Sequence, residues 1–111
     1  MDIKTTVNEG VVIIQPQDDI DMHSSPSLRE ALQLHYKEET KAILADLSKV
    51  KYMDSSGIAT FVECLQWQKA NNKVFVIFSM AENIRGVFEM AKLDTIFTIV
   101  ASEKDAQKHV A

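Results

Sequence analysis

The 111 residues are enough for one domain, and a hydrophobic fraction of 46% excludes a largely disordered chain. Acidic residues outnumber basic ones by 16 to 12, and the basic residues are scattered singly, which argues against a nucleic-acid interface or a polybasic membrane patch. The longest apolar runs, residues 74–78 and 96–101, are too short to span a bilayer, so membrane insertion is not expected. Cys64 is the single cysteine and residues 1–4 do not resemble a secretory signal, so a location in the reducing cytoplasm is expected.

A β-hairpin is predicted at the start of the chain. Residues 3–7 and 11–15 are expected to be strands on either side of a turn at residues 8–10, and the second opens with four β-branched residues in a row. Pro16 is expected to end that strand, because proline has no N–H to donate to a neighbouring strand. A polar, acidic loop over residues 17–21 follows.

A helix and a third strand are predicted next. Ser25 is expected to be the N-cap of the helix, with Pro26 at its first position. Residues at helical spacing are expected to form its inner face: Leu28, Ala31, Leu32 and His35. The apolar run over residues 42–45 has the length of a strand.

The next helix is expected to start near Ser55 and to end at Asn71–Asn72, because asparagine tolerates the left-handed conformation that often closes a helix. Four residues at helical spacing are expected to form its inner face: Ile58, Phe61, Val62 and Leu65. The continuous apolar run Val74–Phe78 then predicts a strand that is covered on both faces, as in parallel sheets.

The last third of the chain predicts a helix, a strand and a short terminal helix. Residues 79–82 resemble a capping box that opens the first of these helices. Its expected inner face consists of Ile84, Val87, Phe88 and Ala91. A strand is expected over residues 96–100, and Ser102 is expected to cap the terminal helix.

Strands and helices therefore alternate in the order ββαβαβαβα. This order predicts a single α/β domain over residues 1–111, with a mostly parallel mixed sheet and packed helices.

The most informative segment, residues 53–58, lies where a strand leads into a helix. Free N–H groups and the helix dipole favour an anion there, so a phosphate on Ser55 could be accommodated without rebuilding the fold. The acidic loop carrying Asp18, Asp19 and Asp21 is expected nearby, because loops at one end of a parallel sheet cluster. The alternative from local chemistry alone is that these serines only cap a helix.

A longer stretch, residues 46–58, resembles the signature of the STAS family (sulfate transporter and anti-sigma factor antagonist). The family pattern is an apolar strand, Asp-Leu-Ser, a short spacer and Asp-Ser-Ser-Gly before a helix, which matches Asp46–Ser48 and Asp54–Gly57. Residues 19–21 resemble the end of the family's Gly-Glu-Leu-Asp loop, and residues 83–97 its third helix and final strand.

The resemblance implies a fold and a function. Among free-standing bacterial anti-sigma factor antagonists, the unphosphorylated protein binds a serine kinase of the histidine-kinase-like ATPase class, often itself an anti-sigma factor. The kinase phosphorylates the first serine of the motif, here Ser55, and a metal-dependent phosphatase reverses the reaction. Ser56 is the less favoured acceptor, and Asp21 matches the acidic residue near the phosphorylation site. The implied function is a phosphorylation-controlled signalling protein that regulates transcription by partner switching.

The partner-binding surface is expected to include Asp21, Met22, His23, Asp54, Ser56, Gly57 and Ile58. Four positions depart from the family pattern, with residues other than glycine or glutamate at Asp18, Asp19, Asn71–Asn72 and Lys92.

A second hypothesis keeps the fold but assigns a constitutive scaffold subunit of a transporter accessory or signalling complex. A third, an enzyme acting through Ser55, predicts labelling by serine-reactive probes without ATP.

Catalysis, a cofactor and a metal site are not expected. The sequence lacks the glycine-rich nucleotide loops and the Gly-x-Ser-x-Gly motif. His23, His35 and His109 show no metal-ligand spacing with Cys64. Cys64 is expected to be a buried, inert thiol, and Trp67 to cover either the edge of the core or an interface.

Overall fold

The computed structural model describes residues 1–110 and confirms the predicted order of elements. The elements are β1 (Ile3–Asn8), β2 (Val11–Pro16), α1 (Ser25–Gln33), β3 (Ala42–Asp46), α2 (Ser55–Ala70), β4 (Val74–Phe78), α3 (Glu82–Met90), the 3₁₀ helix η1 (Leu93–Thr95), β5 (Thr98–Val100) and α4 (Glu103–Gln107).

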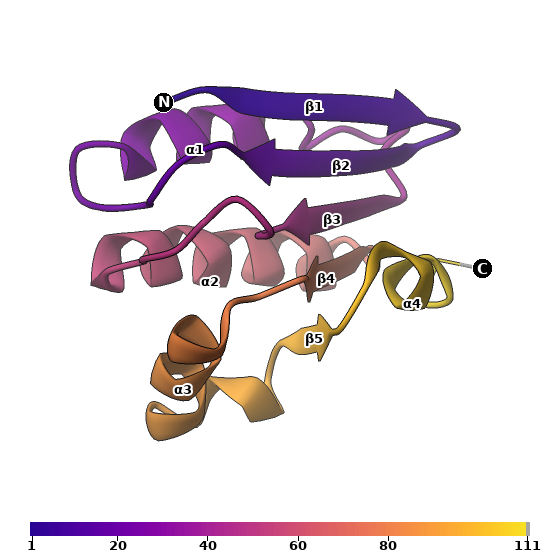
Figure 1. Ribbon diagram of the computed structural model, residues 1–111. Helices are drawn as coiled ribbons and strands as arrows, with labels where there is room; N and C mark the ends of the chain where they lie inside the picture. Colours follow the sequence, from indigo (N-terminus) through magenta and orange to yellow (C-terminus); the bar gives the residue numbers. More distant parts are fainter. Residues whose placement is uncertain (111) are drawn as a thin grey trace.

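The strands form one mixed sheet in the order β1-β2-β3-β4-β5. Only the hairpin of β1 and β2 is antiparallel, and the other neighbours are parallel because a helix separates each pair in the chain. Figure 1 shows the carboxyl ends of β2, β3 and β4 at one edge of the sheet, where the loops to α1, α2 and α3 begin. The segments that lead to Asp21, Ser55 and Met80 therefore start from the same edge of the sheet.

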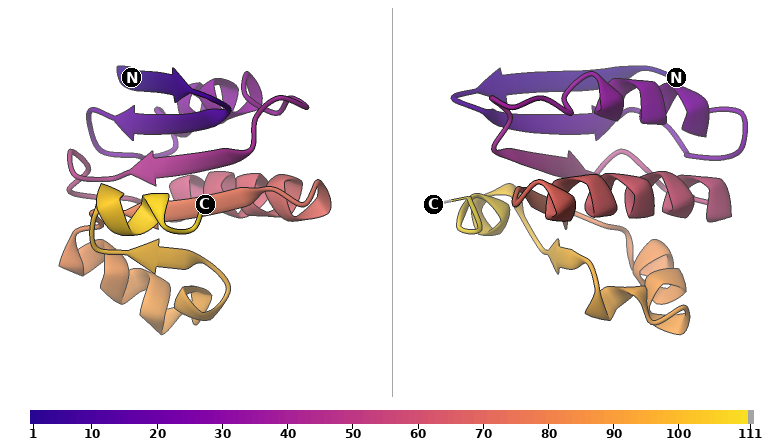
Figure 2. Two further views of the ribbon diagram at one scale, coloured as in Figure 1. Left: turned by 90° about the vertical axis from the view of Figure 1, so that its right-hand side faces the viewer. Right: turned by 180° about the vertical axis from the view of Figure 1, so that it is seen from behind.

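Helices cover the two faces of the sheet unequally. The packing places α1, α2 and α3 on one face of the twisted sheet and the short α4 on the other. Figure 2 shows α1 and α2 side by side in front of the sheet when it is seen from behind. The larger core lies under the three long helices and includes Ile14, Ile43, Phe61 and Phe88. The smaller one joins Ala106 of α4 to β3 and β4. Both faces of these two strands are thus buried, as the continuous apolar run of β4 predicted for that strand.

The two ends of α1 differ from the prediction. Ser24, not Ser25, is the N-cap, and Ser25 is a buried residue inside the helix. The shift arises because Asp21 and Ser24 close a turn with each other, in which the N–H groups of Ser24 and Ser25 both donate to the Asp21 carbonyl. The helix ends at Gln33, so the predicted face is buried at Leu28 and Leu32, and His35 lies beyond the helix.

The start and inner face of α3 also differ from the prediction. Ser79 leaves β4 with a φ of 58° and its hydroxyl donates to the Ala101 carbonyl, so no capping box forms and Ala81 is the N-cap. Ile84 and Phe88 are buried as expected, whereas Val87 is 43% exposed. Ala91 is also exposed, because it lies past the last turn of α3.

The predicted end of β2 is confirmed, whereas the inner face of α2 and the start of β5 differ from the prediction. Pro16 is the last residue of β2 and lies opposite Ile3. On α2, Phe61 and Leu65 are buried as expected, but Ile58 and Val62 are only half-buried. Four more positions of that helix are buried: Gly57, Thr60, Cys64 and Gln68. Asn71 is the C-cap and Asn72 follows at a φ of 58°, so the helix ends where predicted. The last strand starts at Thr98 and not at residue 96, because the N–H groups of Ile96 and Phe97 donate to the Leu93 carbonyl in a turn that follows η1.

Replacing Lys92 with glycine is expected to stabilise the protein. Lys92 has a φ of 59°, a left-handed conformation that costs a side-chain-bearing residue about 1–2 kcal/mol, partly offset by the flexibility of glycine in the unfolded chain. We expect Lys92→Gly to raise the free energy of unfolding by about 0.5–1 kcal/mol in urea titrations. The control Ala91→Gly, at a φ of −84°, should lower it by a similar amount.

Candidate functional site

The motif residues form the N-terminus of α2. Asp54 is the N-cap, and its Oδ1 accepts hydrogen bonds from the Ser56 N–H at 2.9 Å and from the Ser56 hydroxyl at 2.5 Å. The Asp54 carbonyl accepts from the N–H groups of Gly57 and Ile58. Ser55 is the first residue of the helix and is exposed. The sequence therefore places a solvent-accessible hydroxyl beside a fixed carboxylate.

The acidic loop lies directly against this helix start. Ile20 pairs with Met53 in an isolated parallel bridge, and its carbonyl accepts from the Asp54 N–H at 3.0 Å. The Asp19 carboxylate accepts from the N–H groups of Lys51 and Tyr52, both at 3.0 Å. The expected proximity of the loop and the motif is thus observed, and backbone hydrogen bonds hold the two segments together.

A further hydrogen bond, made by the Asp54 side chain, joins the acidic loop to the motif. The Met22 N–H donates to Oδ2 of Asp54 at 3.2 Å, while Oδ1 is occupied by Ser56. Asp21, by contrast, accepts from the N–H groups of His23 and Ser24 within its own loop. These bonds, first that from His23, hold the pKa of the Asp21 carboxyl below its usual range. The Asp54 side chain therefore connects the motif to the loop, as the Asp19 side chain connects the loop to residues 51–52.

The two residues after the serines face inward to different degrees. Gly57 is buried, and a Cβ at this position would lie 2.6 Å from Cγ of Met53 and 2.7 Å from Cγ2 of Ile20. Ile58 is half-buried and packs against the main core. Gly57 thus lets α2 approach the acidic loop closely. It lies beneath the surface that Ser55 and the acidic loop form together.

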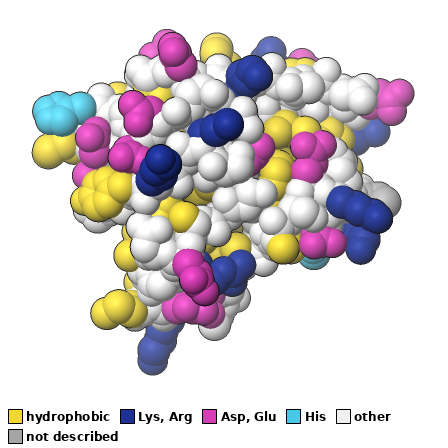
Figure 3. All heavy atoms as spheres, in the orientation of Figure 1, with side chains coloured by type: hydrophobic (Ala, Val, Ile, Leu, Met, Phe, Trp, Pro, Cys, Tyr) yellow, Lys and Arg dark blue, Asp and Glu magenta, His cyan; other side chains and the backbone are white. Residues whose placement is uncertain are grey.

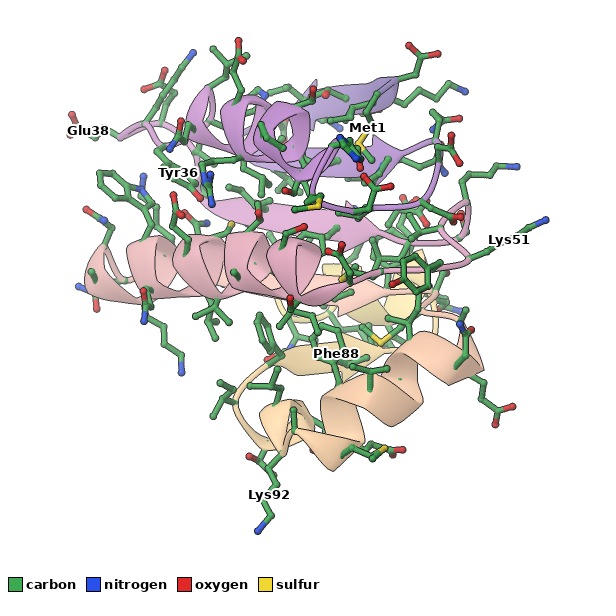
Figure 4. The ribbon with its side chains drawn as sticks, turned by 90° about the vertical axis from the view of Figure 1, so that its left-hand side faces the viewer. Met1, Tyr36, Glu38, Lys51, Phe88 and Lys92 are labelled. Atoms are coloured by element: carbon green, nitrogen blue, oxygen red, sulfur yellow. The ribbon has the colours of Figure 1, made fainter. Side chains whose placement is uncertain are left out.

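Exposed side chains around Ser55 combine acidic and apolar character. Met22 is 69% exposed and Tyr52 is 53% exposed, and His23 is also exposed. Figure 3 shows acidic and hydrophobic side chains interspersed at the end of the molecule where α2 begins. Lys51 points away from the protein beside the motif (Figure 4). Tyr52 is not among the residues predicted for this surface, although its position two residues before Asp54 was a usable signal.

The remaining candidates lie away from this surface. Cys64 is buried, and burial raises the pKa of its thiol to about 12, which agrees with an inert thiol. Trp67 is partly exposed and stacks on Tyr36 with the ring centroids 5.0 Å apart, so it covers the edge of the core near the far end of α2. Within residues 1–110, no cluster of three or more His, Cys, Asp or Glu side chains is arranged to hold a metal.

The Asp54 carboxyl is expected to titrate at an unusually low pH. Its pKa is lowered first by the hydrogen bond from the Ser56 hydroxyl, then by backbone N–H groups of Ser56, Gly57 and Met22. Because the folded-state pKa is the lower one, this contribution to stability is present above the unfolded pKa and is lost as the pH falls through the folded pKa. NMR titration should show the Asp54 pKa rising in Ser56→Ala, whereas the Asp21 pKa should not change.

The STAS domain family model matches residues 2–106, so the chain belongs to the STAS domain family. This confirms the resemblance drawn from residues 46–58. A curated relative from Listeria monocytogenes, named anti-sigma-B factor antagonist, is 30% identical over 81 residues, which cover 73% of this chain and 71% of the relative.

Solved structures share the fold. An anti-sigma factor antagonist from Mycobacterium paratuberculosis superposes with a TM-score of 0.88 at 21% identity, covering 98% of this chain and 92% of the other. The phosphorylated form of SpoIIAA from Bacillus superposes with a TM-score of 0.77 at 19% identity, covering 99% of this chain and all of the other (100%). Within residues 1–110, no helix is long and apolar enough to cross a membrane.

Proposed function

We propose that this protein is an anti-sigma factor antagonist, a binding module that phosphorylation of Ser55 switches off. The observation that carries the proposal is the exposed Ser55 hydroxyl at the start of α2, beside the acidic loop that Asp54 ties to it. The names of its relatives support the role, and the STAS signature supports the choice of serine. The protein acts by binding and is not itself an enzyme.

The partner is a serine kinase of the histidine-kinase-like ATPase class that also serves as an anti-sigma factor. It docks on the unphosphorylated surface formed by Asp21, Met22, His23, Asp54, Ser56 and Ile58, with Gly57 supporting that surface from beneath. Docking occupies the kinase and frees the sigma factor that it would otherwise hold. A metal-dependent serine phosphatase restores the binding-competent form, and the whole cycle takes place in the cytoplasm.

Phosphorylation weakens docking through charge. A phosphate on Ser55 adds about −1.5 to −2 charges at pH 7, next to the Asp54 carboxylate and the acidic loop. The positive end of the α2 dipole favours the phosphate within the protein, so the fold does not need to rearrange. A partner that presses against the same surface must desolvate this added charge, which makes the complex less stable.

Peptide mass spectrometry of the protein from its own cells tests the proposal. The protein is purified with and without the cognate phosphatase, under varied growth and stress. A phosphate on Ser55 that accumulates without the phosphatase is the expected result. Absence of phosphate in every condition would favour the second hypothesis, a constitutive scaffold subunit that uses the same surface without modification.

A further inference from the structure

Two adjacent serines at the start of α2 lie in different environments. Ser55 is exposed, and none of the side-chain hydrogen bonds found within residues 1–110 involves its hydroxyl. Ser56 is half-buried, and its hydroxyl donates to Oδ1 of Asp54 at 2.5 Å. The two groups are chemically identical, so their environments must decide which one reacts.

The Asp54 carboxylate is itself held in place. Its Oδ1 accepts the Ser56 N–H as well as the hydroxyl, and its Oδ2 accepts the Met22 N–H from the acidic loop. One carboxylate oxygen is therefore bonded to the start of α2, and the other is bonded to the acidic loop. A carboxylate fixed in this way keeps the Ser56 hydroxyl turned toward the helix cap instead of toward solvent.

Phosphoryl transfer from ATP requires an accessible serine hydroxyl that can pass its proton to the kinase, and only Ser55 has one. The serine Oγ attacks the γ-phosphorus, an Oγ–P bond forms, the P–O bond to ADP breaks, and the hydroxyl proton passes to a base of the kinase. Oγ of Ser56 lies beside a negative carboxylate, which repels the polyphosphate, and its proton is directed at Asp54 rather than at a base of the kinase. Ser55 also follows Asp54 in the chain, but its hydroxyl is exposed and is not hydrogen-bonded to that carboxylate within residues 1–110, so its proton can be directed at a base of the kinase.

We propose that Asp54 is the residue that selects Ser55 over Ser56 as the phosphate acceptor, by sequestering the Ser56 hydroxyl. The inference rests on the proposed function, since it concerns which serine the kinase modifies. Asp54 acts here as a positioning residue, because it works through Ser56 and does not touch the transferred phosphoryl group.

Thiol reactivity tests the sequestration without any kinase. Ser55→Cys and Ser56→Cys are each made with and without Asp54→Ala, and the rate of reaction with the anionic reagent dithiobis(nitrobenzoate) is measured. The native Cys64 is buried, which makes the unmodified chain the background control. We expect the thiol of Ser56→Cys to react at least about tenfold more slowly than that of Ser55→Cys.

Adding Asp54→Ala should remove most of that difference. Equal rates at the two positions with Asp54 present, or a tenfold difference that survives Asp54→Ala, would overturn the inference. Because alanine also removes the helix cap, circular dichroism must show that each variant is folded, and Asp54→Asn provides a variant that keeps a cap but loses the charge. In Asp54→Asn the rate at Ser56→Cys should rise above that with Asp54 present.

A second measurement uses the phosphorylated protein from cells. The ratio of phosphate on Ser56 to phosphate on Ser55 should rise at least tenfold in Asp54→Ala, and should stay unchanged in Asp18→Ala, which removes a charge from the same loop. An unchanged ratio in Asp54→Ala would contradict selection by Asp54. Wild-type protein without phosphate on Ser55 would instead contradict the proposed function, while the thiol rates would still decide whether Asp54 sequesters Ser56.

Discussion

Ser55→Asp is expected to bind the cognate kinase at least about a hundredfold more weakly than Ser55→Ala, a loss of about 3 kcal/mol. The added carboxylate lies on the exposed first residue of α2, next to the Asp54 carboxylate and the acidic loop. A docked partner must desolvate it among like charges, whereas alanine leaves the surface neutral at this position. Isothermal titration calorimetry with both variants measures the difference.

The matched control is Ser27→Asp, which adds the same charge at another exposed serine in the first turn of a helix. It should bind the kinase as the unmodified protein does, because Ser27 lies on α1 and outside the proposed surface. If Ser55→Asp and Ser55→Ala bound with equal affinity, charge at this position would not control docking. At higher salt, the difference in kinase affinity between Ser55→Asp and Ser55→Ala should become smaller, since screening weakens interactions between exposed charges.

The order of elements could be predicted because each strand carries its own signal. The run Val74–Phe78 is apolar at every position, and burial on both faces of a parallel sheet is what requires this. Helix starts were harder to predict, since several serines could act as caps. Ser79 has the residue type for a cap, but the turn out of β4 fixes its conformation and sends its hydroxyl to Ala101 instead.

The candidate site was only partly predictable for a related reason. The family signature indicated Ser55, Asp54 and Asp21, because those residue types recur at fixed spacing. It did not indicate that Asp54 bonds Met22, since the two residues are 32 positions apart and meet only when the loop after β2 docks on the segment after β3. It did indicate Ser55 over Ser56, but not the environments that distinguish them: Ser55 is exposed, whereas Ser56 is half-buried and its hydroxyl donates to Asp54.

Gly57→Ala is expected to destabilise the protein by about 2 kcal/mol and to lower Tm by about 8 °C. The new Cβ would lie 2.6 Å from Cγ of Met53 and 2.7 Å from Cγ2 of Ile20. Ile20 is fully buried and β-branched, so its side chain cannot rotate away without leaving its preferred rotamer. The destabilisation caused by this clash should therefore exceed the stability that alanine usually gains over glycine in a helix. Calorimetric melting measures the net change in Tm.

The control is Gly86→Ala in α3, where a Cβ would meet nothing within 4 Å. It should raise the free energy of unfolding by about 0.5–1 kcal/mol, because alanine is the better helix former. In an Ile20→Ala background, Gly57→Ala should lower the free energy of unfolding by less than in the native chain, because Cγ2 of Ile20 is gone and only the contact with the flexible Met53 side chain remains. An equal cost in both backgrounds would mean that the helix start and the acidic loop are not packed as closely as the structure places them.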